Sequence, residues 1–423
     1  MLDPLVIFRA AHFAACTVAM GTVAFALLAA SAAGRAGLAE RADFAGIARR
    51  LRALALVALA VAGVSGALWL VLIARNILDV PLGEILDDNG LLSVALDTRF
   101  GRMAALRFVL AVAAIVLLLR NETDCPALVA ATMLMASIVL TGHAGAGTGM
   151  SGLIHVISDV VHLVAAGFWL GGLPALVALL LWGRGDPERG PVVAAVTRRF
   201  STLAVAAVVA IAASGVVNTV ILVGVPSDPF ATTYVRALAL KVGLFAAMLA
   251  LAAFNRFRLT PALPRPGAMG ALAGTAVAET ILGLGAILIV GLLGTLPPAA
   301  HVHTSSAAIK RDAAFVHIHT SEVMADVTID PGRAGLTAAT IHLWHEDYRP
   351  YAADRVRLRL EPKTPRPPAV ERDAQRASDG TWVASDLSIQ TGGEWIARLT
   401  IERDGKAFIL DGAVVLAQCS NEC

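Results

Sequence analysis

Residues 155–172 read His155-Val-Ile-Ser-Asp159-Val-Val-His162-Leu-Val-Ala-Ala-Gly-Phe-Trp169-Leu-Gly-Gly172. The apolar run extends to Trp182, which makes a helix long enough to cross a lipid bilayer. Spacings of four and three residues place His155, Asp159 and His162 on one face of that helix. Ionisable groups inside a bilayer are costly and usually functional. The stretch therefore predicts a membrane helix that carries a transition-metal or proton path.

The composition of the whole chain is typical of a polytopic membrane protein. Of its 423 residues, 57% are hydrophobic, against roughly 45–50% in globular proteins, and the mean hydropathy is +0.72. The net charge of +2 gives no reason to expect nucleic acid as a partner. The four cysteines form neither a CxxC zinc pattern nor a disulfide framework.

Eight apolar segments approach or exceed the roughly 20 residues that a membrane-spanning helix needs. They are residues 5–32, 53–74, 102–120, 126–142, 154–182, 201–223, 234–254 and 271–296, of which the fourth is the shortest. Arginines are concentrated in the loops 33–52, 183–200 and 255–270. The positive-inside rule places these loops in the cytoplasm, so both termini are predicted to lie on the outer side. The first domain, residues 1–296, is thus predicted to be an all-α polytopic membrane bundle.

The character of the sequence changes after Pro297-Pro298. Residues 297–309 are interpreted as a linker, residues 310–416 as an all-β domain, and residues 417–423 as a tail. About seven short alternating strands separated by turn signals predict an antiparallel immunoglobulin-like sandwich. They are 315–320, 322–329, 338–345, 356–360, 381–387, 395–401 and 407–415, and the polar, proline-rich stretch 362–375 is predicted to be a connection.

Polar residues recur at matching positions in the two halves of the bundle. Three correspondences run in the same order along the chain: His12 and Gly21 with His162 and Gly171, Ser65-Gly66 with Ser214-Gly215, and Arg107 with Lys241. A repeat of four spans keeps its orientation, so the halves are predicted to be related by a pseudo-twofold axis along the membrane normal. His12 and His162 would then face each other across that axis. Chance similarity among Ala/Leu/Val helices is the alternative.

Several strings resemble the copper resistance protein D (CopD) family. They are Thr141-Gly-His143-Ala, Asp159-x-x-His162 with Phe168-Trp169-Leu-Gly-Gly172, Arg199-Phe-Ser-Thr-Leu-Ala, and Thr233-Tyr234 with Lys241. Val235 departs from the family, which usually has Gly there. The tail domain resembles the YtkA-like extracytoplasmic domain in His317-Ile-His319-Thr and Gly393-Glu-Trp395. The resemblance implies a multi-pass protein of the bacterial inner membrane that imports copper or supplies it to cuproenzymes. A periplasmic CopC-like copper chaperone is a partner consistent with it.

Candidate metal ligands fall into a membrane group and a tail group. In the membrane they are His155, Asp159 and His162, with His143 in a Gly-rich outer loop and His12 through its repeat mate. His155 and His162 are separated by about 10 Å of helical rise, so the ion is expected to move stepwise between them. A structural polar network between helices is the alternative.

In the tail, His317 and His319 alternate on a strand and so share a face, and Met324 follows on the next strand. Two imidazoles and a thioether suit copper. A solvated polar face is the alternative reading.

The sequence thus favours copper transport or homeostasis, with the copper ion as cargo, over an enzyme. It contains no GxxxxGK[ST] string, so nucleotide hydrolysis by this chain is not expected. Two other functions stay open. Paired histidines on adjacent helices could ligate haem b in an electron-transfer protein, or the chain could be a copper-donating scaffold for oxidase assembly.

Overall fold

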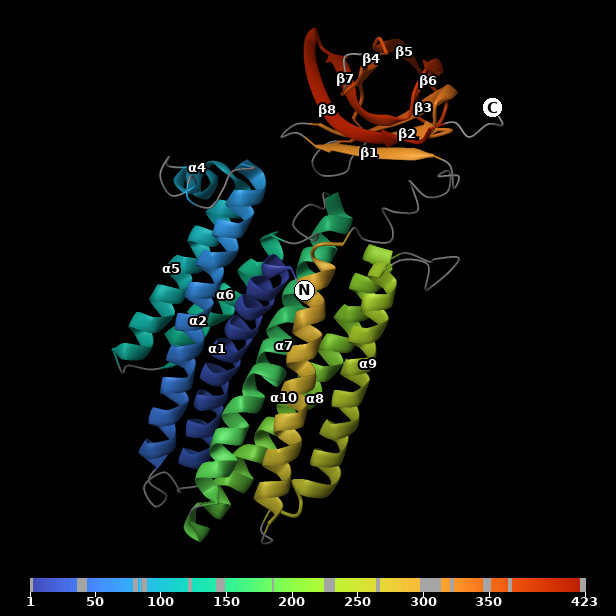
Figure 1. The fold of residues 1–423 in the computed structure, drawn as a ribbon. Helices are drawn as coiled ribbons and strands as arrows, with labels where there is room; N and C mark the ends of the chain where they lie inside the picture. Colours follow the sequence, from blue (N-terminus) through green and yellow to red (C-terminus); the bar gives the residue numbers. More distant parts are fainter. Residues whose placement is uncertain are drawn as a thin grey trace. The chain divides into compact units, whose positions relative to one another are not determined.

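The computed structural model describes residues 3–35, 44–78, 83, 85, 90–120, 124–141, 149–184, 186–223, 233–263, 267–296, 313–319, 323–344, 351–363 and 367–418. These residues divide into a helical unit, up to residue 296, and a β unit, from residue 313. Figure 1 shows both units, and each is described by itself below.

The helical unit is built from long apolar helices. They are α1 (Pro4–Arg35), α2 (Phe44–Leu78), α5 (Arg99–Leu119), α7 (Gly149–Gly183), α8 (Gly190–Val223), α9 (Thr233–Phe254) and α10 (Ala268–Leu293). The shorter elements are α4 (Gly90–Asp97), α6 (Asp124–Ser137), the 3-10 turns η1 (Ile138–Thr141) and η3 (Pro187–Arg189), and the π-helical turn η4 (Asn255–Leu259). Thr98 separates α4 from α5, because its hydroxyl caps α5 by accepting a hydrogen bond from the Gly101 amide at 2.9 Å.

Seven helices within the described part of the chain are long and apolar enough to cross a membrane. The predicted span 126–142 corresponds to the shorter apolar helix Cys125–Thr141. It falls below the roughly 20 residues expected of a span, and its last turn is the tighter 3-10 form. The all-α membrane bundle is therefore confirmed, whereas the eighth span stays a prediction.

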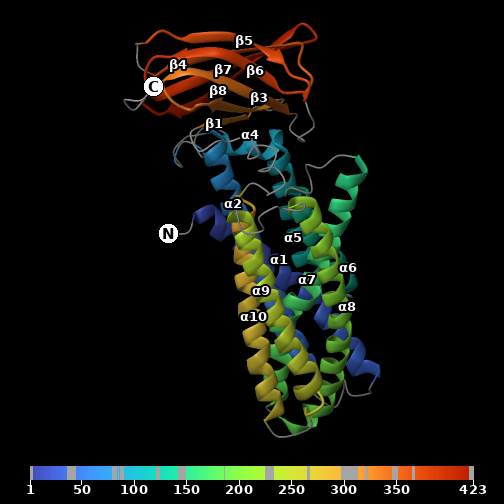
Figure 2. The same cartoon turned by 90° about the vertical axis from the view of Figure 1, so that its right-hand side faces the viewer.

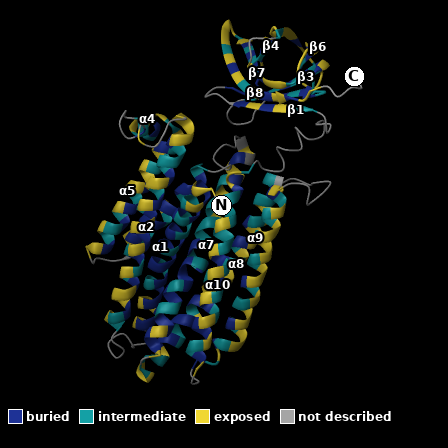
Figure 3. Ribbon diagram, in the orientation of Figure 1, coloured by how far each residue is buried: buried dark blue, intermediate teal, exposed yellow. Residues whose placement is uncertain are grey.

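Helices α1 and α7 form the centre of the bundle. Buried residues make up 67% of the apolar window of α1 and 50% of that of α7, against 6% in α9. Figures 1 and 3 show these two helices side by side, with α2 and α5 to one side and α9 to the other, and Figure 2 shows the same bundle turned by 90°. A Cβ on Gly21 would collide with the backbone of Gly167 and Gly171, and a Cβ on Gly171 would collide with the Thr17 carbonyl.

This crossing pairs positions that the repeat treats as equivalent. Residues 17 and 167 are separated by the same number of residues as 21 and 171. Residue 17 meets residue 171, and residue 21 meets residue 167. A twofold relation between α1 and α7 would produce such a reciprocal contact. We refer below to α1–α6 as the first half and to α7–α10 as the second half. The repeat itself stays a prediction.

The β unit is a single antiparallel sheet of eight strands in the order β1-β2-β3-β6-β5-β4-β7-β8. The strands are β1 (Ala314–His319), β2 (Met324–Asp330), β3 (Gly335–Trp344), β4 (Arg355–Pro362), β5 (Val370–Arg376), β6 (Trp382–Ile389), β7 (Gly393–Arg403) and β8 (Lys406–Leu416). The sheet curves around a shared apolar core that includes Val327, Leu358 and Trp395, and it forms a nearly closed ring in Figure 1. The predicted all-β antiparallel fold is thus confirmed, whereas the eight strands form one nearly closed sheet in place of the two packed sheets and about seven strands of the predicted immunoglobulin-like sandwich.

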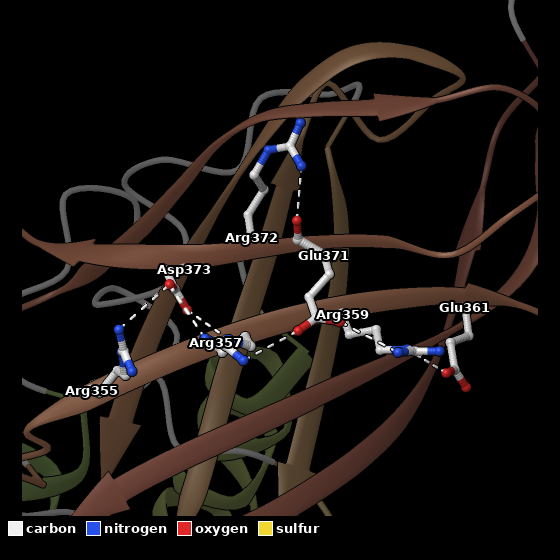
Figure 4. A network of polar contacts seen from close by, with 7 residues as sticks. All are labelled: Arg355, Arg357, Arg359, Glu361, Glu371, Arg372 and Asp373. Carbon is white, nitrogen blue, oxygen red and sulfur yellow. Dashed lines mark hydrogen bonds and ion pairs between the residues drawn. The ribbon is translucent and has the colours of Figure 1, made fainter.

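One strand lies where a connection was predicted. Strand β5 (Val370–Arg376) overlaps the predicted connection 362–375, so that part of the prediction is wrong. Among its residues only Ala374 is buried. Charged side chains instead connect it to β4: Arg357 pairs with Asp373 at 2.7 Å and Arg359 with Glu371 at 3.3 Å (Figure 4). Exposed ion pairs contribute little to stability because solvent screens them, so backbone pairing to β4 and β6 holds this strand.

Candidate metal centre

Three polar side chains meet near the start of α7. His155 is buried, and its Nε2 lies 4.0 Å from Asp159 Oδ2. Asn218 of α8 donates a hydrogen bond from Nδ2 to Asp159 Oδ1 at 2.5 Å. Within the described residues, His155 Nε2 and Asn218 Oδ1 are buried and have no hydrogen-bond partner. Unpaired buried polar atoms are costly, so this arrangement is suited to accept a cation or a water molecule.

His162 lies two turns further along α7 in a defined tautomer. Its Nδ1 is 3.0 Å from Ser214 Oγ of α8. The Ser214 hydroxyl donates to the Ala210 carbonyl at 2.6 Å, so the ring nitrogen must be the donor to Oγ. Nε2 then carries the lone pair, which is the form that binds a metal ion. Lys241 of α9 acts electrostatically on both His162 and Asp159.

The first half holds a comparable but closed arrangement around His12. The His12 Nδ1 donates to the Ala62 carbonyl at 2.9 Å, and Cys16 Sγ is 3.7 Å from Nε2. Both ring nitrogens are therefore engaged within the protein. Arg107 acts electrostatically on His12 and on Cys16, so the nearby fixed charge is positive.

An aromatic residue replaces the amide of the second half. Trp69 lies between two guanidinium groups, with the Arg9 carbon Cζ 5.3 Å and the Arg107 carbon Cζ 5.1 Å from its ring centroid. The ring of Phe100 packs edge-on against it at 5.0 Å. Cation–π contacts of this kind stabilise arginine without a carboxylate. The first half therefore has a guanidinium and aromatic rings where the second half has a carboxylate and an amide, whereas Arg107 in the first half and Lys241 in the second both place a cation near the histidine.

The predicted repeat pairs residues of the first arrangement with residues of the second. The repeat offsets pair Arg9 with Asp159, Trp69 with Asn218, and Phe100 with Tyr234. Tyr234 interacts electrostatically with Asp159. Phe100, the residue of the first half that is paired with Tyr234, contacts Trp69. The sequence reasoning overlooked Asn218 and Trp69, although the repeat register pointed to both.

The described contacts do not bring His12 and His162 together. Each histidine precedes the crossing glycine of its helix, Gly21 or Gly171, by nine residues. Nine residues are two and a half helical turns, so each ring points away from the α1–α7 crossing. His12 accordingly contacts α2 and His162 contacts α8. The prediction that the two rings face each other is thus wrong. The metal role of His12 stays a prediction.

The structure does not describe the remaining residue of the predicted mouth, because His143 is outside the described residues. Among the residues described, no group of three or more His, Cys, Asp or Glu side chains is close enough to hold a metal ion.

In the β unit, the predicted tail residues lie on neighbouring strands. The register places His317 opposite Asp326 and His319 opposite Met324. His317 Nδ1 is 2.6 Å from Asp326 Oδ1, and this hydrogen bond raises the pKa of His317. Met324 is buried but is not among the residues that form the sheet's apolar core. His342 of β3 lies opposite Asp326 on its other side, a neighbour that sequence spacing did not identify.

Comparisons with known proteins agree with this picture. A model of the copper resistance protein D family matches residues 194–293, and a model of the copper resistance protein D-like N-terminal domain matches residues 1–153. The inner membrane protein YebZ of Escherichia coli (strain K12) is 28% identical over 244 residues, which are 55% of this chain and 82% of the relative.

Two further relatives have copper in their names. The copper transport protein CutJ of Bacillus subtilis (strain 168) is 32% identical over 39% of this chain and 29% of its own length. Copper resistance protein D of Pseudomonas syringae pv. tomato is 35% identical over 39% of this chain and 56% of its own length. The chain thus covers less than two thirds of these two proteins. Because the two family models together match residues 1–153 and 194–293, the chain belongs to the copper resistance protein D family.

Proposed function

We propose that this protein carries copper ions inward across the bacterial inner membrane, and that the second half of the bundle holds the path. The observation that carries the proposal is the group of polar atoms near the start of α7. Within the described residues, His155 Nε2 and Asn218 Oδ1 are buried without a hydrogen-bond partner, and the partly exposed Asp159 has its Oδ2 4.0 Å from His155 Nε2. Imidazole nitrogen suits copper in proteins, and a carboxylate compensates the ion's charge.

Asp159 and Lys241 supply an electrostatic balance for this path. Lys241 compensates the Asp159 carboxylate while no ion is bound. An arriving copper ion competes with the ammonium for the same carboxylate, so binding is coupled to a change at Lys241. His162, whose Nε2 carries the lone pair, then offers the next ligand along α7.

The β unit is proposed to bind copper on the outer side through His317, His319 and Met324. Asp326 would orient the His317 ring, as carboxylates do for many metal-binding histidines. A CopC-like soluble carrier is the proposed source of the ion, and both termini are proposed to lie in the periplasm.

The test is copper accumulation in a bacterial strain that lacks other importers. We expect Asp159→Asn and His162→Ala to lower accumulation strongly and Asp97→Asn, an exposed carboxylate at the end of α4, to leave it unchanged. Membrane levels of each variant are measured by immunoblotting. Wild-type accumulation by both site variants would remove the second-half path from the proposal.

Purified protein separates the other candidate functions. Metal analysis and an absorption spectrum are recorded on the same sample. Stoichiometric haem with a Soret band would favour electron transfer over copper transport. Bound copper without any uptake in cells would favour a copper-donating scaffold.

A further inference from the structure

A second polar cluster lies in the bundle, distant from His162. Glu279 of α10 is 2% exposed. Asn255 Nδ2 donates a hydrogen bond to Glu279 Oε1. The Thr275 hydroxyl lies 2.6 Å from Asn255 Oδ1, to which it donates. A chain of hydrogen bonds thus runs from Thr275 through Asn255 to a carboxyl group that is surrounded by apolar helices.

The backbone at Asn255 is unusual. The five residues Asn255–Leu259 form a π-helical turn, in which the Thr260 amide donates to the Asn255 carbonyl at 2.8 Å. Single π-helical turns are rare in proteins, and those that occur are often found at functional sites. Asn255 is itself buried, at the point where the π turn begins.

Glu279 lies far along the bundle from the candidate metal centre. Gly283 of α10 packs against Leu170 of α7, and Gly270 packs against Arg184. Glu279 is therefore level with residues near Pro174, about 18 Å of helical rise from His162. It lies toward the end of the bundle where the arginine-rich loops are found, which is the predicted cytoplasmic side.

The charged and titratable groups on the elements that pack against α10 can be named. They are Asp3, Arg9, His12, Cys16 and Arg35 on α1, His155, Asp159 and His162 on α7 with Arg184 just beyond it, Tyr234, Arg236 and Lys241 on α9, and Arg256 and Arg258 on η4. Arg256 donates to the carbonyl and hydroxyl of Ser201. Within the described residues, Glu279 makes no ion pair, and its hydrogen bond comes from the neutral amide of Asn255.

A carboxylate that is buried in a membrane protein without a cation is costly, and such a group resolves the cost by holding a proton. We propose that Glu279 is a proton-binding site, and that it releases and rebinds a proton while copper is transported. The inference rests on the proposed function, and it names the coupling ion. The step is the dissociation of the Glu279 carboxylic acid into carboxylate and H⁺, and the Asn255 amide continues to donate its hydrogen bond to Oε1 of the carboxylate.

The experiment uses the full-length protein in proteoliposomes that contain a pH-sensitive dye. Copper is added outside, and internal copper and internal pH are followed together. We expect wild-type protein to change the internal pH as copper enters. Glu279→Gln keeps an acceptor for Asn255 but cannot titrate, so the pH change is lost, whereas Glu279→Asp retains it. Glu188→Gln, the same substitution at an exposed position on η3, is the matched control.

The outcomes distinguish this inference from the proposed function. Copper entry with an unchanged pH response in Glu279→Gln, or with none in the wild type, overturns the proton site alone. Absence of copper entry in the wild type overturns the proposed function. Reaction with dicyclohexylcarbodiimide, which modifies protonated carboxyl groups in apolar surroundings, is a second measurement that needs no variant. Mass spectrometry should find Glu279 labelled at neutral pH, and an unlabelled Glu279 contradicts the inference.

Discussion

Asn218 of α8 donates a hydrogen bond to Asp159 of α7 over 2.5 Å, and the repeat places Trp69 and Arg9 at the same two positions of the first half. The side-chain oxygens of Asp159 and Asn218 in one half thus correspond to a guanidinium over an indole ring in the other. The Arg9 carbon Cζ lies 5.3 Å from the Trp69 ring centroid. At these two positions of the predicted repeat, the first half therefore carries a cation and an aromatic ring, and the second half carries a carboxylate and an amide.

Replacing the amide tests whether it supports the metal centre. Asn218→Ala removes the donor to Asp159 and the buried acceptor beside it. We expect copper accumulation to fall by about tenfold, as it does when partners of metal ligands are removed. Thr219→Ala, the neighbouring residue whose hydroxyl bonds its own helix at 2.7 Å, is the control. Equal accumulation in both variants would show that Asn218 is structural.

The two histidines are expected to differ in importance. His162→Ala removes a ligand with an available lone pair and should lower copper accumulation by at least about tenfold. His12→Ala removes a ring whose two nitrogens are engaged by Ala62 and Cys16. We expect it to lower thermal stability in detergent and leave accumulation per folded molecule unchanged. An equal loss of transport in both variants would restore His12 to the copper path.

The α1–α7 crossing can be tested by adding a single methyl group. Gly171→Ala places a Cβ against the Thr17 carbonyl, so the helices must move apart. We expect a loss of about 1–3 kcal/mol of stability, measured as a lower unfolding midpoint of the purified protein. Gly63→Ala on α2 is the matched control, because no heavy atom lies within 4 Å of its added Cβ. A drop of equal size in both variants would mean that the crossing is not the cause.

The tail provides a pH prediction outside the membrane. The hydrogen bond that the His317 ring donates to the Asp326 carboxylate raises the pKa of His317. Protonated His317 therefore stabilises the β unit at pH values below its ordinary pKa, and this contribution is lost as the pH rises through the raised value. NMR titration should find His317 titrating above an ordinary histidine, and Asp326→Asn should lower its pKa. A pKa unchanged by Asp326→Asn would contradict the role of this hydrogen bond.

Topology is tested by fusions. We expect alkaline phosphatase to be active when fused after Cys423 and inactive when fused after Gly37, because the arginine pattern places the 33–52 loop in the cytoplasm. The reverse pattern would invert the proposed direction of copper movement.

Much of the architecture was accessible from the sequence because it depends on local hydrophobic pattern. The long apolar runs predicted the membrane bundle, and alternation predicted most strands of the β unit. Strand β5 was missed because its sequence, Val-Glu-Arg-Asp-Ala-Gln-Arg, buries only Ala374 and is held by backbone pairing. The segment 126–142 has the composition of a span, but its helix is too short to be counted with the others.

The candidate site divides in the same way. Helical spacing was sufficient to place His155 and Asp159 on one face of α7, where the structure brings them together. Asn218 comes from another helix, so no spacing within the α7 segment could reveal it. The direction in which His12 points depends on its angular position around the axis of α1 relative to Gly21, which faces α7. The predicted repeat paired His12 with His162 without taking this angular position into account.

In the predicted repeat, the backbone contact at Gly21 and Gly171 has a consequence for how the two halves can diverge. A contact between main-chain atoms requires small residues at the crossing and places no demand on polar positions elsewhere in each half. One half can then carry Arg9 and Trp69 while the other carries Asp159 and Asn218, and the contact between the halves is unchanged. Among relatives, we accordingly expect little variation at the two glycines. We expect more variation at the paired positions 9 and 159 and at the paired positions 69 and 218.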